Sequence, residues 1–425
     1  MATNLPGIDL RLAQETDLPQ VIKLGQLAFS PLTSTSEIEQ AWFSQGVHPV
    51  CGQRFIAVDN LTGLGVGAYA HLDLKIALEG QEFPAKGVAS LAVAPERRGQ
   101  RIAQFLVEQA LEEWRSQQIP LSMLYPFQHG FYRKLGWAWT GRVHQYAIAS
   151  YHLPIYPERF SMVPYDPTQH QQALKDAYHR SAMRHNGWLI RQEEWWQSRL
   201  KPQNGREIYC YVESGKLLGY LILQFAYPPG QPSALSVVVQ EWVALNVDAY
   251  RGIIGFLSAL RDQVQTVVWN TYPEDPFPHL LREQQRDPGI GRTSRAESLF
   301  GLTYRFGEIG GGFMWRLVDV AIAFRLRPIK PGAPFILTFQ ITDPVLGEQT
   351  VTANFTAGRM HPVTQPVPAV IKTSIEHLTE LFCGLRRATE LVWTREIEFD
   401  GSDRALLQKL DAAWDCTPPF CWDSF

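Results

Sequence analysis

A short basic turn at residues 94–101 joins a buried, apolar strand at residues 87–93 to an amphipathic helix. The apolar face of that helix consists of Ala103, Leu106, Val107, Ala110 and Trp114. Backbone N–H groups at a helix start, together with the positive end of the helix dipole, form a ready site for a pyrophosphate. Arg97, Arg98 and Arg101 add positive charge there. The turn therefore predicts an α/β fold with an anion site where this strand ends.

The residues around this turn alternate strand and helix patterns, as expected for one compact α/β unit over residues 1–150. The predicted strands lie at residues 8–12, 55–58, 65–72, 87–93, 121–125 and 137–148, with a short helix around residues 131–135.

A stretch rich in Pro and Tyr at residues 151–157 marks the end of this unit. The following residues repeat its order of strands and helix, which indicates a degenerate duplication over residues 151–299. The second copy has no Arg-rich turn, and Asp248 would repel a phosphate there, although Arg251 leaves room for a functional role. From Gly301 the pattern becomes that of an α+β domain, so residues 300–425 form the third predicted domain.

Composition limits the classes of partner. The chain has 425 residues, of which 45% are apolar and 19% charged, and its formal net charge is -3. This balance gives no general attraction to nucleic acid or to an anionic membrane, and it suits a cationic substrate better. The start of the chain shows no signal-peptide pattern and no apolar run of about 18 residues occurs, so we expect a cytosolic protein. Five cysteines without a CxxC pair predict neither a zinc site nor a disulfide framework.

Four segments together resemble a known family. Residues 98–103 resemble the pyrophosphate signature of the GNAT acetyltransferases, with Arg101 in place of its central glycine, and residues 124–137 resemble the family's Tyr-x-x-x-Gly-aromatic element. Residues 312–320 and the aromatic end at residues 420–425 resemble segments of the three-domain Eis (enhanced intracellular survival) branch. The resemblance spans nearly the whole chain.

The resemblance implies a fold of two tandem GNAT-like domains, the second degenerate, plus a C-terminal domain similar to sterol carrier protein. It implies acetyl-coenzyme A as cosubstrate, no metal, and a homohexamer built from trimers. The implied acceptors are polyamine-like cations such as aminoglycosides. An acidic chain end fits such acceptors: residues 396–425 contain seven acidic side chains and two basic ones.

The resemblance also assigns roles to residues. Tyr132 corresponds to the general acid that protonates the departing thiolate, and the terminal carboxylate of Phe425 belongs to the active site, where it accepts the amine proton. An N–H near Val93 would polarise the thioester carbonyl. The backbone expected to pair with the pantetheine arm is that of Leu91, Ala92 and Val93. The turn expected to bind the pyrophosphate consists of Arg98, Gly99, Gln100, Arg101, Ile102 and Ala103.

Other interpretations stay open at this stage. The chain could be a protein lysine or N-terminal acetyltransferase, or a lipid-binding scaffold without activity. The basic turn could be a solvated charge run, Tyr132 a core residue, and the acidic chain end an ordinary surface. His71, His129 and His144 are weaker candidates for a base, because histidines are dispersed through the chain.

Overall fold

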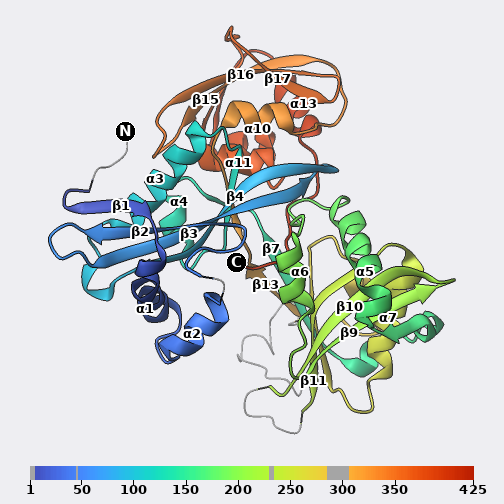
Figure 1. Cartoon of the computed structure of the whole chain (residues 1–425). Coiled ribbons are helices and arrows are strands. Elements are labelled where there is room, and N and C mark those ends of the chain that lie inside the picture. Colours follow the sequence, from blue (N-terminus) through green and yellow to red (C-terminus); the bar gives the residue numbers. More distant parts are fainter. Residues whose placement is uncertain (1–4, 45, 229–233, 285–305) are drawn as a thin grey trace, which may run out of the picture. The chain divides into compact units, whose positions relative to one another are not determined.

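The computed structural model describes residues 5–44, 46–228, 234–284 and 306–425, and the chain forms two compact units (Figure 1). One unit combines Met1–Gly141 with Gly312–Phe425, and the other is Arg142–Gly311. The predicted first and third domains therefore share one compact unit. Within the described ranges, no helix is both long and apolar enough to cross a bilayer.

The first sheet has seven strands in the order β1-β2-β3-β4-β5-β14-β6. β4 and β5 are parallel, and the other neighbours are antiparallel. The strands are β1 (Ile8–Leu12), β2 (Gly52–Asp59), β3 (Gly65–Leu78), β4 (Gln81–Val93), β5 (Leu121–Leu124), β14 (Met314–Leu317) and β6 (Ala138–Trp139).

Helices cover both faces of this sheet, because neighbouring side chains of a strand point to opposite faces and both sets are apolar here. On one face α1 (Leu18–Phe29) and α2 (Thr35–Trp42) enclose a core that includes Ala68 and Ala92. On the other face α3 (Ile102–Ser116) and α4 (His129–Arg133) share a core with Val88.

The far side of the first sheet differs from the sequence prediction. A last strand over residues 137–148 was expected, but β6 ends at Trp139, and Arg142–Ala149 is β7 of the second unit. β14 lies between β5 and β6 instead. Residues 312–320, expected to open the C-terminal domain, thus supply a strand to the first sheet. The sequence does not reveal which sheet β7 and β14 join, because both segments are short and apolar enough for either sheet.

Two glycines let the chain leave this sheet and return to it at one point. Gly141 donates its N–H to the Phe313 carbonyl at 3.0 Å, and Gly312 donates to the Gly141 carbonyl at 3.0 Å. A Cβ atom at Gly141 would lie 2.7 Å from the Phe313 ring, and one at Gly312 would lie 2.9 Å from the Gly141 oxygen. The two backbone segments pack this closely only because neither position carries a side chain.

The C-terminal sheet has five strands in the order β17-β16-β15-β18-β19, of which β15 and β18 are parallel. Its strands are β15 (Phe335–Thr342), β16 (Gln349–Thr356), β17 (Arg359–Val363), β18 (Val370–Ser374) and β19 (Glu398–Asp400). Its helices are α10 (Val320–Leu326), α11 (Ile375–Phe382), α12 (Ala388–Trp393) and α13 (Ala405–Ala413). Figure 1 shows this sheet in orange.

The second unit has a seven-stranded sheet in the order β13-β7-β12-β11-β10-β9-β8. The strands besides β7 are β8 (Met162–Pro164), β9 (Arg206–Glu213), β10 (Lys216–Ala226), β11 (Ser236–Ala244), β12 (Thr266–Thr271) and β13 (Gly307–Gly311). The helices are α5 (Pro167–Ala182), α6 (Glu193–Leu200), α7 (Val247–Ala259) and α8 (Phe277–Leu280).

The second sheet repeats the order of the first, since antiparallel strands lead into a parallel pair, β11 and β12, joined through α7. The sequence prediction of a degenerate duplication is therefore confirmed at the level of the fold. The predicted boundary at 150/151 falls just after β7, which belongs to the second sheet, and the one at 299/300 lies outside the described residues.

Candidate active site

β4 and β5 separate part of the way along the first sheet. Their last paired residues are Val88 and Leu124, and β4 continues alone on that side to Val93 among the described strands. Pro126 follows two residues after β5 ends, and a proline has no N–H to donate and disfavours further pairing. Among the described strands, the edge of β4 from Ala89 to Val93 is therefore unpaired, and we refer to the gap between the two diverging strands as the cleft.

A β-bulge lies on this unpaired part of β4. Ala68 pairs with Ala92 and Ala70 with Ala89, so Tyr69 alone faces two residues of β4. Ser90, one of those two, has a φ of 52°. Bulges of this kind bend a strand and re-aim its groups, and they are common beside active sites.

The backbone N–H of Val93 points to the cleft. The next residue, Ala94, donates its N–H to the Val66 carbonyl of β3 at 3.0 Å. Because successive N–H groups of a strand point to opposite edges, that of Val93 faces the side where β5 has ended. This orientation is the one required of an oxyanion donor at Val93.

The basic turn follows β4 directly and contains two left-handed residues. Gly99 has a φ of 79° and Arg101, the N-cap of α3, a φ of 63°. Arg101 stands where the GNAT signature has glycine, and it adopts the backbone conformation that glycine favours. An arginine thus adopts here, with some backbone strain, a conformation that glycine adopts freely.

The N–H groups at the start of α3 are available to a ligand. The first of them that donates to a backbone carbonyl is that of Phe105, which bonds Arg101 at 2.9 Å. The N-cap side chain of Arg101 accepts no hydrogen bond from the helix. The donors of residues 102–104 thus remain for an anion, as at other helix starts.

The three arginines of the turn are not equivalent. Arg97 forms an ion pair with Asp59, whose side chain is largely buried, so its charge is already neutralised. Arg98 and Arg101 are exposed, and Arg101 makes a long contact of 3.4 Å to Gln104. Of the three arginines that the sequence suggested for the pyrophosphate, only Arg98 and Arg101 therefore have a charge to offer a phosphate.

Tyr132 lies on α4, just beyond the end of β5. Its side chain is 3% exposed and packs edge-on against the rings of Phe127, Phe131 and Trp137 at 5.5, 5.0 and 6.0 Å. Burial raises the pKa of the phenol above its ordinary value. The hydroxyl is therefore protonated at neutral pH, as a proton donor must be.

The chain terminus is docked against the same cleft. A Cβ atom built on Gly87 of β4 would lie 2.9 Å from the Phe425 ring, and that ring meets Tyr125 edge-on at 6.0 Å. Figure 1 shows the red end of the chain reaching the first sheet. Gly87 makes room for this ring because it has no side chain. The sequence shows Gly87 only as one residue of an apolar strand and gives no sign of this role.

Tyr132 and Phe425 approach the cleft from opposite faces of the sheet. Phe425 contacts Gly87, whereas Tyr132 shares a core with the next residue, Val88. Neighbouring residues of a strand project to opposite faces. A group transferred through the cleft would therefore have the phenol on one side and the chain end on the other.

The three histidines do not meet at this cleft. His71 is 2% exposed beside Trp114, and burial, followed by the nearby Lys86, lowers its pKa to about 4. His144 lies in the second unit, bonded to Tyr146 at 3.2 Å. His129 lies on α4 beside the ring of Trp139, with ring centroids 6.2 Å apart.

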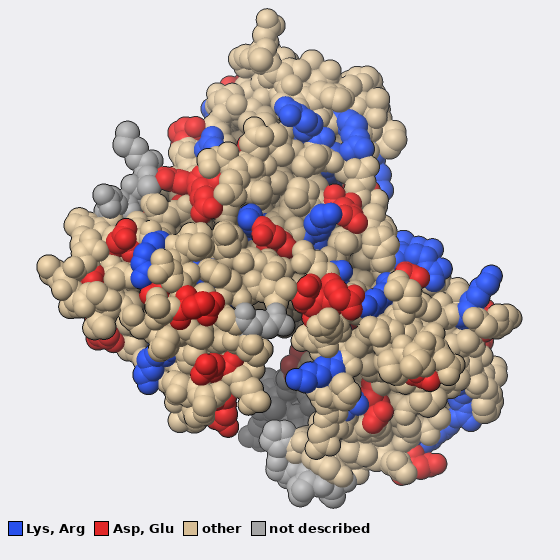
Figure 2. All heavy atoms as spheres, viewed as in Figure 1, with Lys and Arg blue, Asp and Glu red and all other residues tan. Residues whose placement is uncertain are grey.

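Several acidic side chains near the chain end form ion pairs or hydrogen bonds with other residues of the protein. Glu396 pairs with Arg386 at 2.6 Å, Glu398 lies 3.6 Å from Lys372, and Asp411 accepts hydrogen bonds from Thr389. On the face drawn in Figure 2, acidic and basic side chains are interspersed. Three of the seven acidic side chains are therefore engaged with neighbouring groups of the protein, and Asp423, buried two residues before Phe425, is the member nearest the terminus.

The equivalent place in the second unit is filled. The side chain of Asn246 caps α7 by accepting the Ala249 N–H at 2.8 Å. Beyond the last parallel pair of β11 and β12, Trp242 donates its indole N–H to the Asn270 carbonyl at 3.3 Å. Arg251, for which a functional role was left open, pairs with Glu158 at 2.7 Å. These contacts favour a structural role for this copy.

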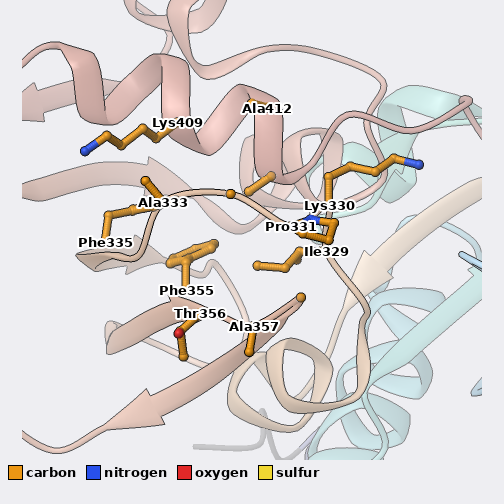
Figure 3. Close-up of a pocket in the computed structure, with 13 residues that line it drawn as sticks. Ile329, Lys330, Pro331, Ala333, Phe335, Phe355, Thr356, Ala357, Lys409 and Ala412 are labelled. Carbon is orange, nitrogen blue, oxygen red and sulfur yellow. The ribbon is translucent and has the colours of Figure 1, made fainter.

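A cavity of about 100 Å³ lies in the C-terminal domain, away from the cleft (Figure 3). Ile329, Pro331 and Phe355 line it, and the amino groups of Lys330 and Lys409 point outward at its two ends. Ligand pockets usually measure about 300–1,000 Å³. The domain interior beside it is filled by the ring of Trp414, which contacts Phe324, Phe339, Phe355 and Phe382.

Family models match all three parts of the chain. A model described as acetyltransferase (GNAT) domain matches residues 9–140, a second with the same description matches residues 187–305, and a sterol carrier protein domain matches residues 320–422. The predicted fold class, including the degenerate second copy and the C-terminal domain, agrees with these matches.

Curated relatives and solved structures agree with the models. N-acetyltransferase Eis of Mycobacterium bovis is 23% identical over 83% of this chain and 84% of its own length, and that of Mycobacterium tuberculosis is 22% identical over the same shares. A GCN5-related N-acetyltransferase from Anabaena variabilis superposes with a TM-score of 0.83 at 20% identity, covering 98% and 100% of the two chains. Eis1 of Mycobacterium abscessus superposes with a TM-score of 0.75 at 18% identity, with the same coverage.

The unequal arginines of the turn lead to a binding prediction. Arg98→Ala should weaken acetyl-coenzyme A binding by about ten-fold, because it removes a charge-assisted hydrogen bond to phosphate. Arg97→Ala is the control, since its charge is already paired, and should change the affinity by no more than about two-fold at physiological salt. Calorimetry checks both values. Unchanged affinity in Arg98→Ala, or two equivalent sites per chain, would contradict the assignment.

Proposed function

We propose that this chain, a member of the Eis family of GNAT acetyltransferases, transfers the acetyl group of acetyl-coenzyme A to an amine of a polycationic small molecule. The observation that carries the proposal is the cleft between β4 and β5. A basic turn that leads into α3 follows the end of β4, and Tyr132 and Phe425 lie on opposite faces of the cleft.

The residues of the cleft suit this cosubstrate. Arg98, Arg101 and the N–H groups at the start of α3 would bind the pyrophosphate. The unpaired edge of β4, from Ala89 to Val93, would pair with the amide groups of the pantetheine arm as a further strand would. Such pairing would bring the thioester carbonyl near the Val93 N–H, which would stabilise charge on the carbonyl oxygen.

The chemistry is a direct displacement. The neutral amine nitrogen bonds to the acetyl carbon, and the bond between that carbon and sulfur breaks. Tyr132 gives its proton to the departing thiolate and recovers one from solvent. The amine proton, which becomes far more acidic as the new bond forms, passes to the carboxylate of Phe425 directly or through water.

The acceptor class rests on charge and on resemblance. The formal net charge of the chain is -3, and residues 396–425 carry seven acidic side chains against two basic ones. A polycation presents several ammonium groups, of which one can lose its proton and react while the others bind. Aminoglycosides and linear polyamines have this pattern. The cytosolic location and the hexamer of two trimers remain predictions.

Two other functions compete. A protein lysine or N-terminal acetyltransferase would use the same cleft with a peptide acceptor. A lipid-binding scaffold is disfavoured because the Trp414 ring fills the interior of the C-terminal domain, where it contacts Phe324 and Phe339.

A thiol-release screen separates these functions. With acetyl-coenzyme A, we expect release with aminoglycosides and linear polyamines and much less with lysine peptides, and mass spectrometry should find the acetylated amine. Release with peptides alone would favour the protein-acetylating alternative. A lipid that copurifies, without thiol release by any amine, would contradict the proposal.

Tyr132→Phe tests the general acid. The change removes the proton donor but keeps the ring, so turnover should fall by about 10²–10⁴-fold while acetyl-coenzyme A affinity stays constant. Tyr69→Phe is the matched control, because Tyr69 is 1% exposed in the same core, and it should keep near-normal turnover. Steady-state kinetics and calorimetry measure both quantities, and a fully active Tyr132→Phe enzyme would remove this role.

The terminal carboxylate is tested by moving it. A short Gly-Ser extension after Phe425, or deletion of Phe425, should lower turnover by about ten-fold or more, because each displaces the base. The same extension placed before Met1 is the control. Circular dichroism checks that each variant is folded. A C-terminally extended enzyme with normal turnover would contradict the role of the carboxylate.

A further inference from the structure

Arg316 on β14 is fully buried and bridges two parts of the first unit. Its Nε donates to the Leu135 carbonyl at 2.8 Å, and its Nη1 donates to the Leu317 carbonyl at 2.8 Å. Its Nη2 donates to Oδ1 of Asp343 at 2.6 Å, and both side chains of this ion pair are 0% exposed. The guanidinium therefore touches the C-terminal domain on one side and the residues after α4 on the other.

The Leu135 carbonyl belongs to the turn that fixes Tyr132. The Tyr132 carbonyl accepts hydrogen bonds from the N–H groups of Leu135 at 2.9 Å and Trp137 at 3.1 Å. Gly136 between them has a φ of 90°, and a Cβ atom there would lie 2.6 Å from Ile375 and 3.1 Å from Nε of Arg316. The turn is thus packed against the C-terminal domain without spare room.

Arg316 also supports the ring on which Tyr132 packs. Its guanidinium carbon lies 5.4 Å from the centre of the Trp137 ring, and that ring meets the Tyr132 ring edge-on at 6.0 Å. Arg316 therefore contacts the residues that hold Tyr132 in two ways: Leu135 bonds the Tyr132 backbone, and Trp137 packs on the Tyr132 ring.

Asp343 is itself held in place. It accepts the N–H groups of Val345 and Leu346, both at 2.9 Å. The Leu346 carbonyl in turn accepts a hydrogen bond from Nη1 of Arg115 on α3 at 3.0 Å. A buried guanidinium is stable only when paired, so Arg316 depends on this carboxylate. The loop after β15 is thereby bonded both to the Tyr132 turn, through Arg316, and to the helix that begins at the basic turn.

We propose that Arg316, fixed by Asp343, is a positioning residue that holds the Tyr132 hydroxyl in reach of the departing thiolate. The inference rests on the proposed function, in which Tyr132 is the general acid. A misplacement of about 1 Å can cost a catalytic group up to about 100-fold in rate. The C-terminal domain would thus contribute to catalysis through the tyrosine as well as through the chain end.

Arg316→Lys tests this role, because lysine keeps the charge but lacks the planar fork that reaches Leu135 and Asp343 together. Arg327→Lys is the matched control. Arg327, 1% exposed in the C-terminal domain of the same compact unit, donates a hydrogen bond to the Trp414 carbonyl at 3.2 Å and lies over the Phe382 ring. Both changes are made in the normal enzyme and in Tyr132→Phe.

In the normal enzyme, Arg316→Lys should lower kcat by about ten-fold and leave KM for acetyl-coenzyme A nearly unchanged. In the Tyr132→Phe background the same change should lower kcat by less than about two-fold, because the group it positions is absent. Arg327→Lys should have little effect on kcat in either background. A double-mutant cycle of this kind separates positioning from loss of stability.

Equal losses from Arg316→Lys in the two backgrounds, or equal losses from Arg327→Lys, would overturn the inference. A fully active Tyr132→Phe enzyme would instead contradict the proposed general acid, so the two failures are distinguishable. If Arg316→Lys does not fold, Asp343→Asn takes its place in the cycle. The amide keeps an acceptor for the loop N–H groups but removes the charge that fixes Arg316.

Discussion

The rest of the first unit depends on the insertion of β14 between β5 and β6, because β14 completes the sheet that carries the cleft. β5 is the strand at the cleft, and its other edge would be exposed without β14. An unpaired edge in the middle of a catalytic sheet would be open to wrong pairing. The N-terminal domain is therefore complete only when residues after Gly312 are present, and for this reason it forms one compact unit with the C-terminal domain.

This arrangement also explains the position of the chain end. Because the C-terminal domain is bound to the first sheet through β14 and through the pair of Arg316 and Asp343, its last residues can reach Gly87. The proposed acid, Tyr132, and the proposed base, Phe425, then come from different parts of the sequence but lie at the same cleft. The second unit repeats the fold, but at the equivalent place the Trp242 indole bonds the Asn270 carbonyl and the Asn246 side chain caps α7.

The motifs were predictable from sequence, whereas the sheet partners of the strands around them were not. The turn at residues 98–103, the helix after it and the aromatic chain end have local signals, so their elements were predicted correctly. The partners of β7 and β14 were not, because short apolar strands carry no information on which sheet they join. Arg101 could not be judged either, since nothing in sequence shows that an arginine will adopt a left-handed φ. The role of the acidic chain end stays a prediction, because net charge does not reveal which carboxylates already have partners.

The central claim is that thiol, phenol and chain end meet in the cleft between β4 and β5. A crystal structure of the protein with coenzyme A tests it most directly. The pyrophosphate should contact Arg98 and the start of α3, and the sulfur should lie within about 3.5 Å of the Tyr132 hydroxyl, on the side of the cleft opposite Phe425. Coenzyme A bound in the second unit, or a sulfur out of reach of Tyr132, would contradict the account.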